Sequence, residues 1–187
     1  MKADTKLFRK WLSLLLALVM LVGMIPATTL TAFAESNYSV WVGGVRMHDG
    51  DYLANGATAT QITKPSGGYA YYKDGTLTLN NYSYTGIGYF YYENEVTRRA
   101  IIYTSNAIQI ELVGTNNLTQ EKYNNLTGQI YVNTACISGD ASVSLTGAGT
   151  LNLQNAIWGI KCKSYLSIES GNLNVDACEY GVYSWDQ

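Results

Sequence analysis

Apolar residues occupy every second position in the last third of the chain, and this alternation recurs after roughly 22 positions. Residues 142–161 read SVSLTGAGTLNLQNAIWGIK, and residues 165–184 read YLSIESGNLNVDACEYGVYS. Leu151 aligns with Leu173 at this spacing, and Leu145 aligns with Ile168 when one more position is allowed. Strict alternation predicts strands with one buried face. Its repetition at this period predicts the stacked layers of a β-solenoid, in which each layer needs a neighbour to close the core.

The alignment of the two segments predicts which side chains face the core. We expect residues 149–153 and 172–176 to pair as parallel strands, with Leu151 beside Leu173. The side chains expected to point inward and stack are Leu145, Leu151, Leu153, Ile160, Ile168, Leu173, Val175 and Val182.

Earlier parts of the chain repeat the pattern with longer spacings. IQIELVGTNNL at 108–118 aligns with residues 141–151, which sets Ile110 against Val143. GTLTLNN at 75–81 parallels GTLNLQN at 149–155. The intervening segments 82–99 and 119–129 are predicted to be loops inserted between coils. We therefore expect about four to five coils over residues 75–187, right-handed by the rule for parallel crossovers.

Residues 1–34 have a different pattern. Lys2, Lys6, Arg9 and Lys10 precede an apolar run of about fifteen residues, which is short for a membrane span of about 20, and the segment ends Ala-Phe-Ala. This arrangement is typical of a secretory signal peptide, so we expect a secreted, extracellular protein whose mature chain begins near Glu35. A retained membrane anchor is the alternative.

Residues 35–74 precede the repeats and are expected to form an N-terminal β-cap. SVWVGGVRM at 39–47 alternates like a strand, and its Gly43-Gly44 pair indicates a bulge or a tight bend. Asp74-Gly75 between two alternating segments predicts a hairpin. Such a cap would cover the open strand edges at this end of the solenoid.

Charge and cysteine content narrow the function classes. Without Asp4 and the four basic residues of the segment 1–34, eight Lys and Arg remain against thirteen Asp and Glu. This acidic balance argues against nucleic acid and against the membrane surface as partners. The three cysteines, Cys136, Cys162 and Cys178, are too few for a disulfide scaffold, so we interpret them as small buried residues.

Candidate catalytic residues are sparse. His48 is the only histidine, it lies in a loop-like segment, and no nucleophile motif accompanies it. Glu93 and Glu95 would share one face of a strand and could act as a carboxylate pair. A lyase would need a base, for which Arg98 or Arg99 could be offered. We expect no catalytic residues and interpret this segment as a solvated, charged loop.

Aromatic residues are the more informative chemistry. Eight tyrosines and Phe90 lie within residues 69–92. A tyrosine ring can stack on the C–H face of a sugar while its hydroxyl bonds a sugar oxygen, although tyrosines also pair across strands for structural reasons. The candidate glycan-binding residues are Tyr82, Tyr84, Tyr89, Tyr91, Tyr92 and Trp158. Replacing Tyr89, Tyr91 and Tyr92 with Ala is expected to weaken binding without changing the fold.

Four segments in order carry a family resemblance: SVWVGGVRM, KDGTLTLNN, GDASVSLTGAGTLNLQ and GIKCKSYLSIESGNLNV. Together they resemble the secreted bacterial carbohydrate-binding β-helix domains, whose fold is a right-handed parallel β-helix similar to that of pectate lyases. The resemblance implies a polysaccharide partner such as pectic acid and calcium held by acidic loops. Asp140, Asp176 and Glu179 are scattered here, so no acidic cluster supports a calcium site, and no cofactor is expected.

Three function classes stay open at this stage. A non-catalytic module for pectin- or cellulose-like polysaccharide, or an adhesive module, accounts for the signal peptide and the tyrosines. A polysaccharide lyase accounts for the fold but lacks identifiable catalytic residues. A structural stalk of a larger bacterial surface protein accounts for the repeats alone. Exposed aromatic rows would favour the binder, and two carboxylates within reach of one groove would favour the enzyme.

The last repeat predicts the behaviour of the chain in solution. The strand at 180–184 is followed by no capping pattern, so we expect a longer solenoid in the natural protein and self-association or a frayed last coil for this chain. Light scattering after size exclusion tests this expectation. A monodisperse monomer with strong hydrogen-exchange protection across 172–184 would contradict it.

Overall fold

The computed structural model describes residues 40–121, 133–176 and 178–185, all of which belong to one compact unit, Asn37–Gln187. These residues contain seventeen strands and no helix, which confirms the all-β prediction. None of this described part is a helix that could cross a membrane. The predicted signal peptide lies outside the described residues, and the boundaries expected at 34 and 74 stay predictions.

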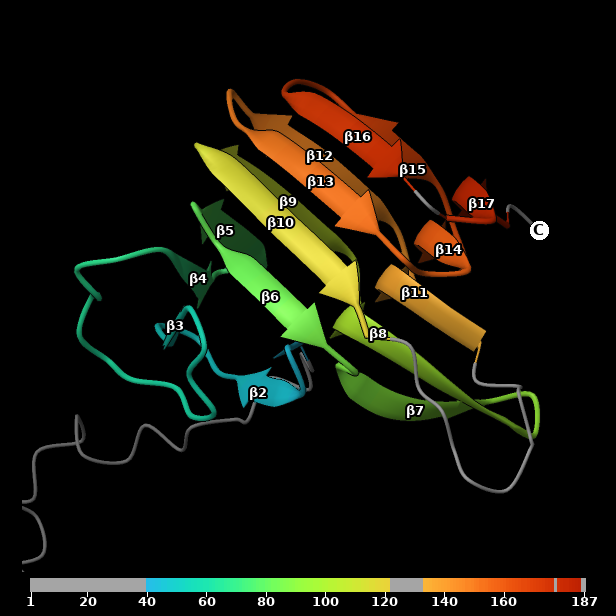
Figure 1. Cartoon of the computed structure of the whole chain (residues 1–187), viewed down its shortest axis with the longest axis horizontal. Coiled ribbons are helices and arrows are strands. Elements are labelled where there is room, and N and C mark those ends of the chain that lie inside the picture. The colour runs from blue at the N-terminus through green and yellow to red at the C-terminus, as the bar shows by residue number, and fades with distance from the viewer. Residues whose placement is uncertain (1–39, 122–132, 177, 186–187) are drawn as a thin grey trace, which may run out of the picture. The chain divides into compact units, whose positions relative to one another are not determined.

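The described strands form three sheets, here called A, B and C (Figure 1). Sheet A contains β1 (Val40–Val42), β2 (Val45–Met47), β7 (Tyr89–Glu93), β8 (Val96–Thr104), β11 (Asn133–Gly139), β14 (Trp158–Cys162) and β17 (Tyr180–Ser184). Sheet B contains β3 (Tyr52–Ala54), β4 (Tyr69–Lys73), β5 (Thr76–Asn80), β9 (Ile108–Val113), β12 (Val143–Gly147) and β15 (Leu166–Ile168). Sheet C contains β6 (Ser83–Gly86), β10 (Thr115–Gln120), β13 (Thr150–Gln154) and β16 (Asn172–Asp176).

From β5 onwards the chain visits sheets B, C and A in rotation. The described strands make four such triplets, β5-β6-β8, β9-β10-β11, β12-β13-β14 and β15-β16-β17. Each strand pairs in parallel with its counterpart in the next triplet. Figure 1 shows this most plainly for β6, β10, β13 and β16, whose arrows run side by side in one direction. The predicted pairing of Leu151 with Leu173 is confirmed.

One cluster of buried apolar side chains draws on all three sheets. Leu77, Ile110 and Leu145 come from successive strands of sheet B and are each fully buried. Leu118 and Leu153 pair across sheet C and are fully buried too. The alternating pattern therefore places aliphatic residues one above another in the interior, where their burial is the main stabilising contribution.

The strands before β5 pair differently. β1 and β2 form an antiparallel hairpin beside β8, while β3 and β4 extend sheet B antiparallel to β5. The Asp74-Gly75 hairpin is confirmed, with φ of 48° and 79° at the two turn residues. Gly43 and Gly44 form a similar two-residue turn between β1 and β2 with φ of 59° and 84°. Positive φ at both turn positions matches the right-handed twist of the joined strands.

The register predicted for the second triplet is wrong by two positions. Ile110 lies beside Leu145 rather than Val143, and the partner of Val143 is Ile108. Because alternate residues of a strand share one face, a shift of two leaves the same side chains facing the core. Alternation in the sequence cannot distinguish the two registers.

Two further predictions about the early repeats are wrong. Residues 82–99 are not an inserted loop, because they contain β6, β7 and the start of β8. Residues 75–81 contain β5, which pairs with β9 in sheet B, whereas residues 149–155 contain β13 of sheet C. The local sequences GTLTLNN and GTLNLQN are alike because both are half-buried strands, not because they stack. The predicted loop at 119–129 lies mostly outside the described residues.

The inward residues of the last triplet are less covered than those before it. Leu173 and Val175 are half-buried against the core. Ile168 and Val182, which were expected to stack inside, are 49% and 46% exposed. Strands β15, β16 and β17 are terminal in their sheets within the described residues, so each has a neighbour on one side.

The stacked core predicts a clear difference between two isoleucines. Ile110→Ala removes a fully buried side chain between β5 and β12 and is expected to lower the free energy of unfolding by about 2–5 kcal/mol. Ile62→Ala is the control, because Ile62 is 88% exposed and should change stability by less than about 0.5 kcal/mol. Urea denaturation measures both. Equal effects would contradict the stacked interior.

Candidate functional site

The outer face of sheet A carries a second group of packed side chains, separate from the main core. It comprises Tyr91, Ala100, Tyr103 and Ala135, with Trp41, Tyr89 and Trp158 packed against them. The parallel register sets two rows across this face. One row is Ala100, Ala135, Trp158 and Tyr180, and the other is Tyr103, Ser138, Lys161 and Tyr183. In the first row, small residues thus give way to aromatic ones toward β17.

Four aromatic rings pack along one side of this face. Trp41 of β1 stacks on Tyr89 of β7, with ring centroids 4.3 Å apart and planes 19° apart. Tyr103 of β8 contacts Tyr89 at 5.4 Å and stacks on Tyr91 at 4.5 Å. The Tyr91 hydroxyl lies 2.8 Å from the Ser138 hydroxyl, and the Tyr103 hydroxyl donates to Asp140 at 2.8 Å. These rings support one another and have fixed orientations.

An ionic cluster lies beside the rings, centred on Glu93 at the end of β7. The Glu93 carboxylate is 2.5 Å from Arg98 Nε, 2.5 Å from Lys161 Nζ and 3.0 Å from Lys163 Nζ. Lys163 also reaches Asp140 at 2.8 Å. Only 8% of the Glu93 side chain is exposed. A buried carboxylate with several cationic partners is well compensated, and removal of one member leaves unpaired charge.

The surroundings of Glu93 act on its pKa in opposite directions. Burial by itself raises the pKa of a carboxyl, because it disfavours the charged form. Hydrogen bonds from Lys161 and Lys163, and the charges of Lys161 and Arg98, outweigh this effect and hold the pKa of Glu93 below its ordinary value. Glu93 is therefore ionised at neutral pH.

A cavity of about 470 Å³ opens on the same face, lined by Arg98, Trp158, Lys161, Tyr180 and Tyr183. Trp158 and Tyr180 lie on neighbouring strands with nearly parallel rings 6.2 Å apart. The Arg98 guanidinium is 5.7 Å from the Trp158 ring centre, and Lys161 Nζ is 5.3 Å from it. Both separations are within the range of cation–π attraction. The cavity thus combines flat rings with two cations, which suits a ring-shaped, polar ligand.

Tyr82 and Tyr84 share one face, as predicted, but that face is the inner one. Tyr84 pairs with Leu118 of the core, and Tyr82 just before β6 is 1% exposed. Burial raises the pKa of Tyr82. The proposal that Tyr82 binds a glycan is therefore wrong, because its ring has no free surface.

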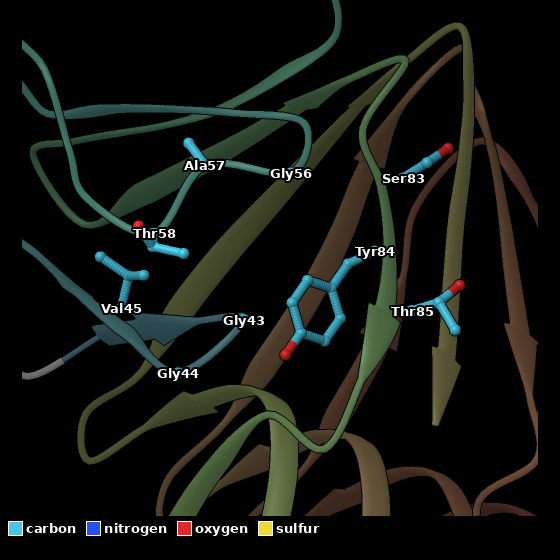
Figure 2. A pocket seen from close by; sticks show the side chains of 9 residues that line it. All are labelled: Gly43, Gly44, Val45, Gly56, Ala57, Thr58, Ser83, Tyr84 and Thr85. Carbon is cyan, nitrogen blue, oxygen red and sulfur yellow. The ribbon is translucent and has the colours of Figure 1, made fainter. Parts of the chain in front are cut away.

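Tyr84 keeps part of its ring open because β6 is the first strand of sheet C. It lines a cavity of about 430 Å³ with Gly43 and Gly44 of the β1–β2 turn and with Thr58 from the segment between β3 and β4. Figure 2 shows its ring directed toward Gly43 and Gly44, while Ser83 and Thr85 point to the other side of β6. A Cβ on Gly43 would lie 2.6 Å from the Tyr84 ring, so glycine is needed there for the close approach. The polar atom of the ring is already engaged, because its hydroxyl accepts a hydrogen bond from the Gly88 amide.

The other predicted aromatic residues lie on or near the outer face of sheet A. Tyr89 is half-buried, Tyr91 is buried, and Tyr92 on the opposite side of β7 is 72% exposed. Burial raises the pKa of Tyr91 to about 12. Replacing Tyr89, Tyr91 and Tyr92 together is now expected to disturb the fold, because Tyr91 packs on Tyr103 and bonds Ser138.

The segment around Glu93 is not the solvated, charged loop that was expected, and Glu93 and Glu95 do not form the alternative carboxylate pair either. Glu93 ends β7 and is buried, whereas Glu95 lies in the following turn with φ of 63° and is exposed. His48 is a solvent-facing loop residue that contacts its neighbour Asp51 at 3.2 Å. In residues 40–121, 133–176 and 178–185, no three His, Cys, Asp or Glu side chains lie together as metal ligands. The described residues therefore do not form the acidic cluster that the resemblance implies for calcium.

Several residues of this face were not predicted from the sequence. Trp41, Tyr103, Asp140, Lys161, Lys163 and Tyr180 come from segments that looked like a cap, coil strands and turns. Of the aromatic residues on this face, only Trp158 and the tyrosines of β7 were among the predicted candidates. The period-2 alternation of β14 and β17 does indicate outward positions, but it does not reveal which outward residues become neighbours across the sheet.

The lowered pKa of Glu93 predicts a pH dependence of stability. Its ionised form is favoured in the folded state, so this contribution is fully present above the ordinary carboxyl pKa and is lost as pH falls through the lowered folded value. Glu93→Gln is expected to be less stable than the parent at pH 7 and to lose less stability on acidification. Denaturation at pH 7, 5 and 3 measures this. Identical pH profiles would contradict the role of Glu93.

Comparison with known proteins adds a family to this geometry. Residues 94–187 match the family model described as carbohydrate-binding domain-containing protein. This match spans the start of β8 through β17 and hence includes Arg98, Trp158, Lys161 and Tyr180. No curated protein matches the chain. No solved structure matches it either. The chain belongs to the family of carbohydrate-binding domain-containing proteins.

Proposed function

We propose that this protein is a secreted, non-catalytic module that holds a polysaccharide on the outer face of sheet A. The observation that carries the proposal is the cavity of about 470 Å³ in which Trp158 and Tyr180 lie beside Arg98 and Lys161. It lies within the residues matched by the carbohydrate-binding family model. Sugar sites commonly combine aromatic faces for C–H stacking with a few placed polar groups.

The charge of the cavity favours one kind of polysaccharide. Arg98 and Lys161 line it, and no carboxylate is among its lining residues in the described part of the chain. Basic side chains bind carboxylates through charge-assisted hydrogen bonds, so a pectin-like acidic glycan fits this surface better than a cellulose-like neutral one. The exposed ring of Tyr180 offers a stacking surface for either.

The proposed architecture is a right-handed parallel β-helix. The rotation of the chain through sheets B, C and A supports it, as does the parallel pairing of each triplet with the next. In such a fold the outer faces of consecutive layers line up, so a linear ligand can contact several layers at once. The signal-peptide pattern of residues 1–34 supports secretion.

The lyase alternative finds less support. Arg98, one of the two arginines that the sequence offered as a base, pairs with the buried carboxylate of Glu93, so its guanidinium is already engaged. Glu93 in turn is held as an ion by Lys161 and Lys163. The side chains near the cavity are thus arranged to bind charge rather than to transfer a proton.

Replacing either of the two aromatic rings that line the cavity tests the proposal. Tyr180→Ala and Trp158→Ala are expected to weaken retention on pectic acid about tenfold, corresponding to about 1.4 kcal/mol, because each removes a stacking surface of the cavity. The assay is a polysaccharide pull-down with and without a calcium chelator, with far-UV circular dichroism to check the fold.

Tyr165→Ala is the matched control, because Tyr165 is 63% exposed and does not line the cavity. It should bind like the parent. If the parent protein is retained on no polysaccharide, the proposed binding function is contradicted and the interpretation as a structural stalk is favoured. If Tyr165→Ala weakens binding as much as Tyr180→Ala, the site lies elsewhere.

A further inference from the structure

Two cationic side chains contact both Glu93 and the cavity beside Trp158. On one side Arg98 Nε and Lys161 Nζ contact the Glu93 carboxylate. On the other side the same two residues line the Trp158 cavity. The cationic surface available to a ligand is therefore held in place, and partly neutralised, by a carboxylate supplied by the protein itself.

The balance of charge in this cluster is close. Arg98, Lys161 and Lys163 supply three positive charges, and Glu93 and Asp140 supply two negative ones among the described residues of the cluster. One positive charge is left in excess. Because Glu93, Arg98 and Lys161 have side chains only 8%, 13% and 9% exposed, solvent screens their charges less than those of surface residues.

The hairpin that carries Glu93 positions it for this role. β7 and β8 pair antiparallel from Tyr89–Ala100 to Glu93–Val96 and are joined by Asn94 and Glu95, both with positive φ. The alternation of β7 places Tyr89, Tyr91 and Glu93 on the buried side and Phe90 and Tyr92 on the exposed side. Stacking of Tyr91 on Tyr103 then fixes the end of the hairpin over β11 and β14.

We propose that Glu93 is a specificity-determining residue, an internal carboxylate that limits the positive charge of the Trp158 cavity and so sets its preference between acidic and neutral glycans. The proposal rests on the proposed function of the same face. With Glu93 ionised, the cluster offers one net positive charge, enough to favour an acidic sugar moderately. Without that carboxylate it offers two, and the preference for acidic over neutral glycans rises.

A pair of charge-matched variants tests the proposal. Glu93→Gln removes the carboxylate with little change of shape, and Glu95→Gln makes the same change of net charge at the exposed turn two residues away. The probes are an oligogalacturonide and a neutral cello-oligosaccharide of equal length, measured by titration calorimetry at low and physiological salt. We expect Glu93→Gln to bind the oligogalacturonide on the order of fivefold more tightly at low salt, with little change for the neutral probe. Glu95→Gln should behave like the parent.

A third variant keeps the test sharp if Glu93→Gln folds poorly. Lys163→Gln removes the most exposed cation of the cluster, whose side chain is 40% exposed, and should weaken oligogalacturonide binding by a similar factor. Binding of the acidic probe that is unchanged in both Glu93→Gln and Lys163→Gln, while the parent binds, would overturn the role of Glu93 and leave the proposed function standing. Equal effects of Glu93→Gln and Glu95→Gln would overturn it as well. A parent that binds neither probe would instead refute the proposed function.

Discussion

The stacking of aliphatic side chains between successive layers is the constraint on which the rest of this structure depends. Strands such as β5, β9 and β13 bury one face only, so a single triplet of strands cannot enclose a core. Leu77, Ile110 and Leu145 stand beside one another because three strands of sheet B share one register. The same register leaves the opposite face of each sheet free for other chemistry.

Two outer faces show how different that chemistry is. Sheet C presents a row of amides in which Asn174 donates to Asn152 and Asn152 donates to Asn117, each at 2.8 Å. These groups satisfy one another, so the row stabilises the stack. Sheet A presents rings and charged groups whose partners lie on different strands, and its cavity is open to a ligand. The cavity that holds both rings and cations therefore lies on the second of these faces.

The ionic cluster depends on contacts between distant parts of the chain. Lys161 and Glu93 are 68 residues apart in sequence, yet they form a buried hydrogen bond. The β7–β8 hairpin brings Glu93 over the sheet, and the parallel layers bring Lys161 to it. A carboxylate among cations is a weak source of net stability, which is consistent with a role in setting the charge of the face rather than in holding the fold together.

The sequence by itself determined the local structure wherever the repeat is uninterrupted. The pairing of Leu151 with Leu173 was predicted correctly because alternating burial follows from the order of neighbouring residues. The Asp74-Gly75 hairpin was predicted correctly because the residue types of the turn favour positive φ. The predicted partner of Ile110 was wrong by two positions, because a shift of two residues keeps the same face of the strand inward.

Only the tertiary structure decided which outward residues meet. Tyr82 is buried in the core, whereas Tyr92 is exposed to solvent. Glu93 forms ion pairs with Arg98, Lys161 and Lys163. Which face of a strand is buried depends on that strand's own sequence. A binding site on a sheet depends on the register between strands and on where the β7–β8 hairpin places its side chains. Those are set by long-range packing, and no local pattern encodes them.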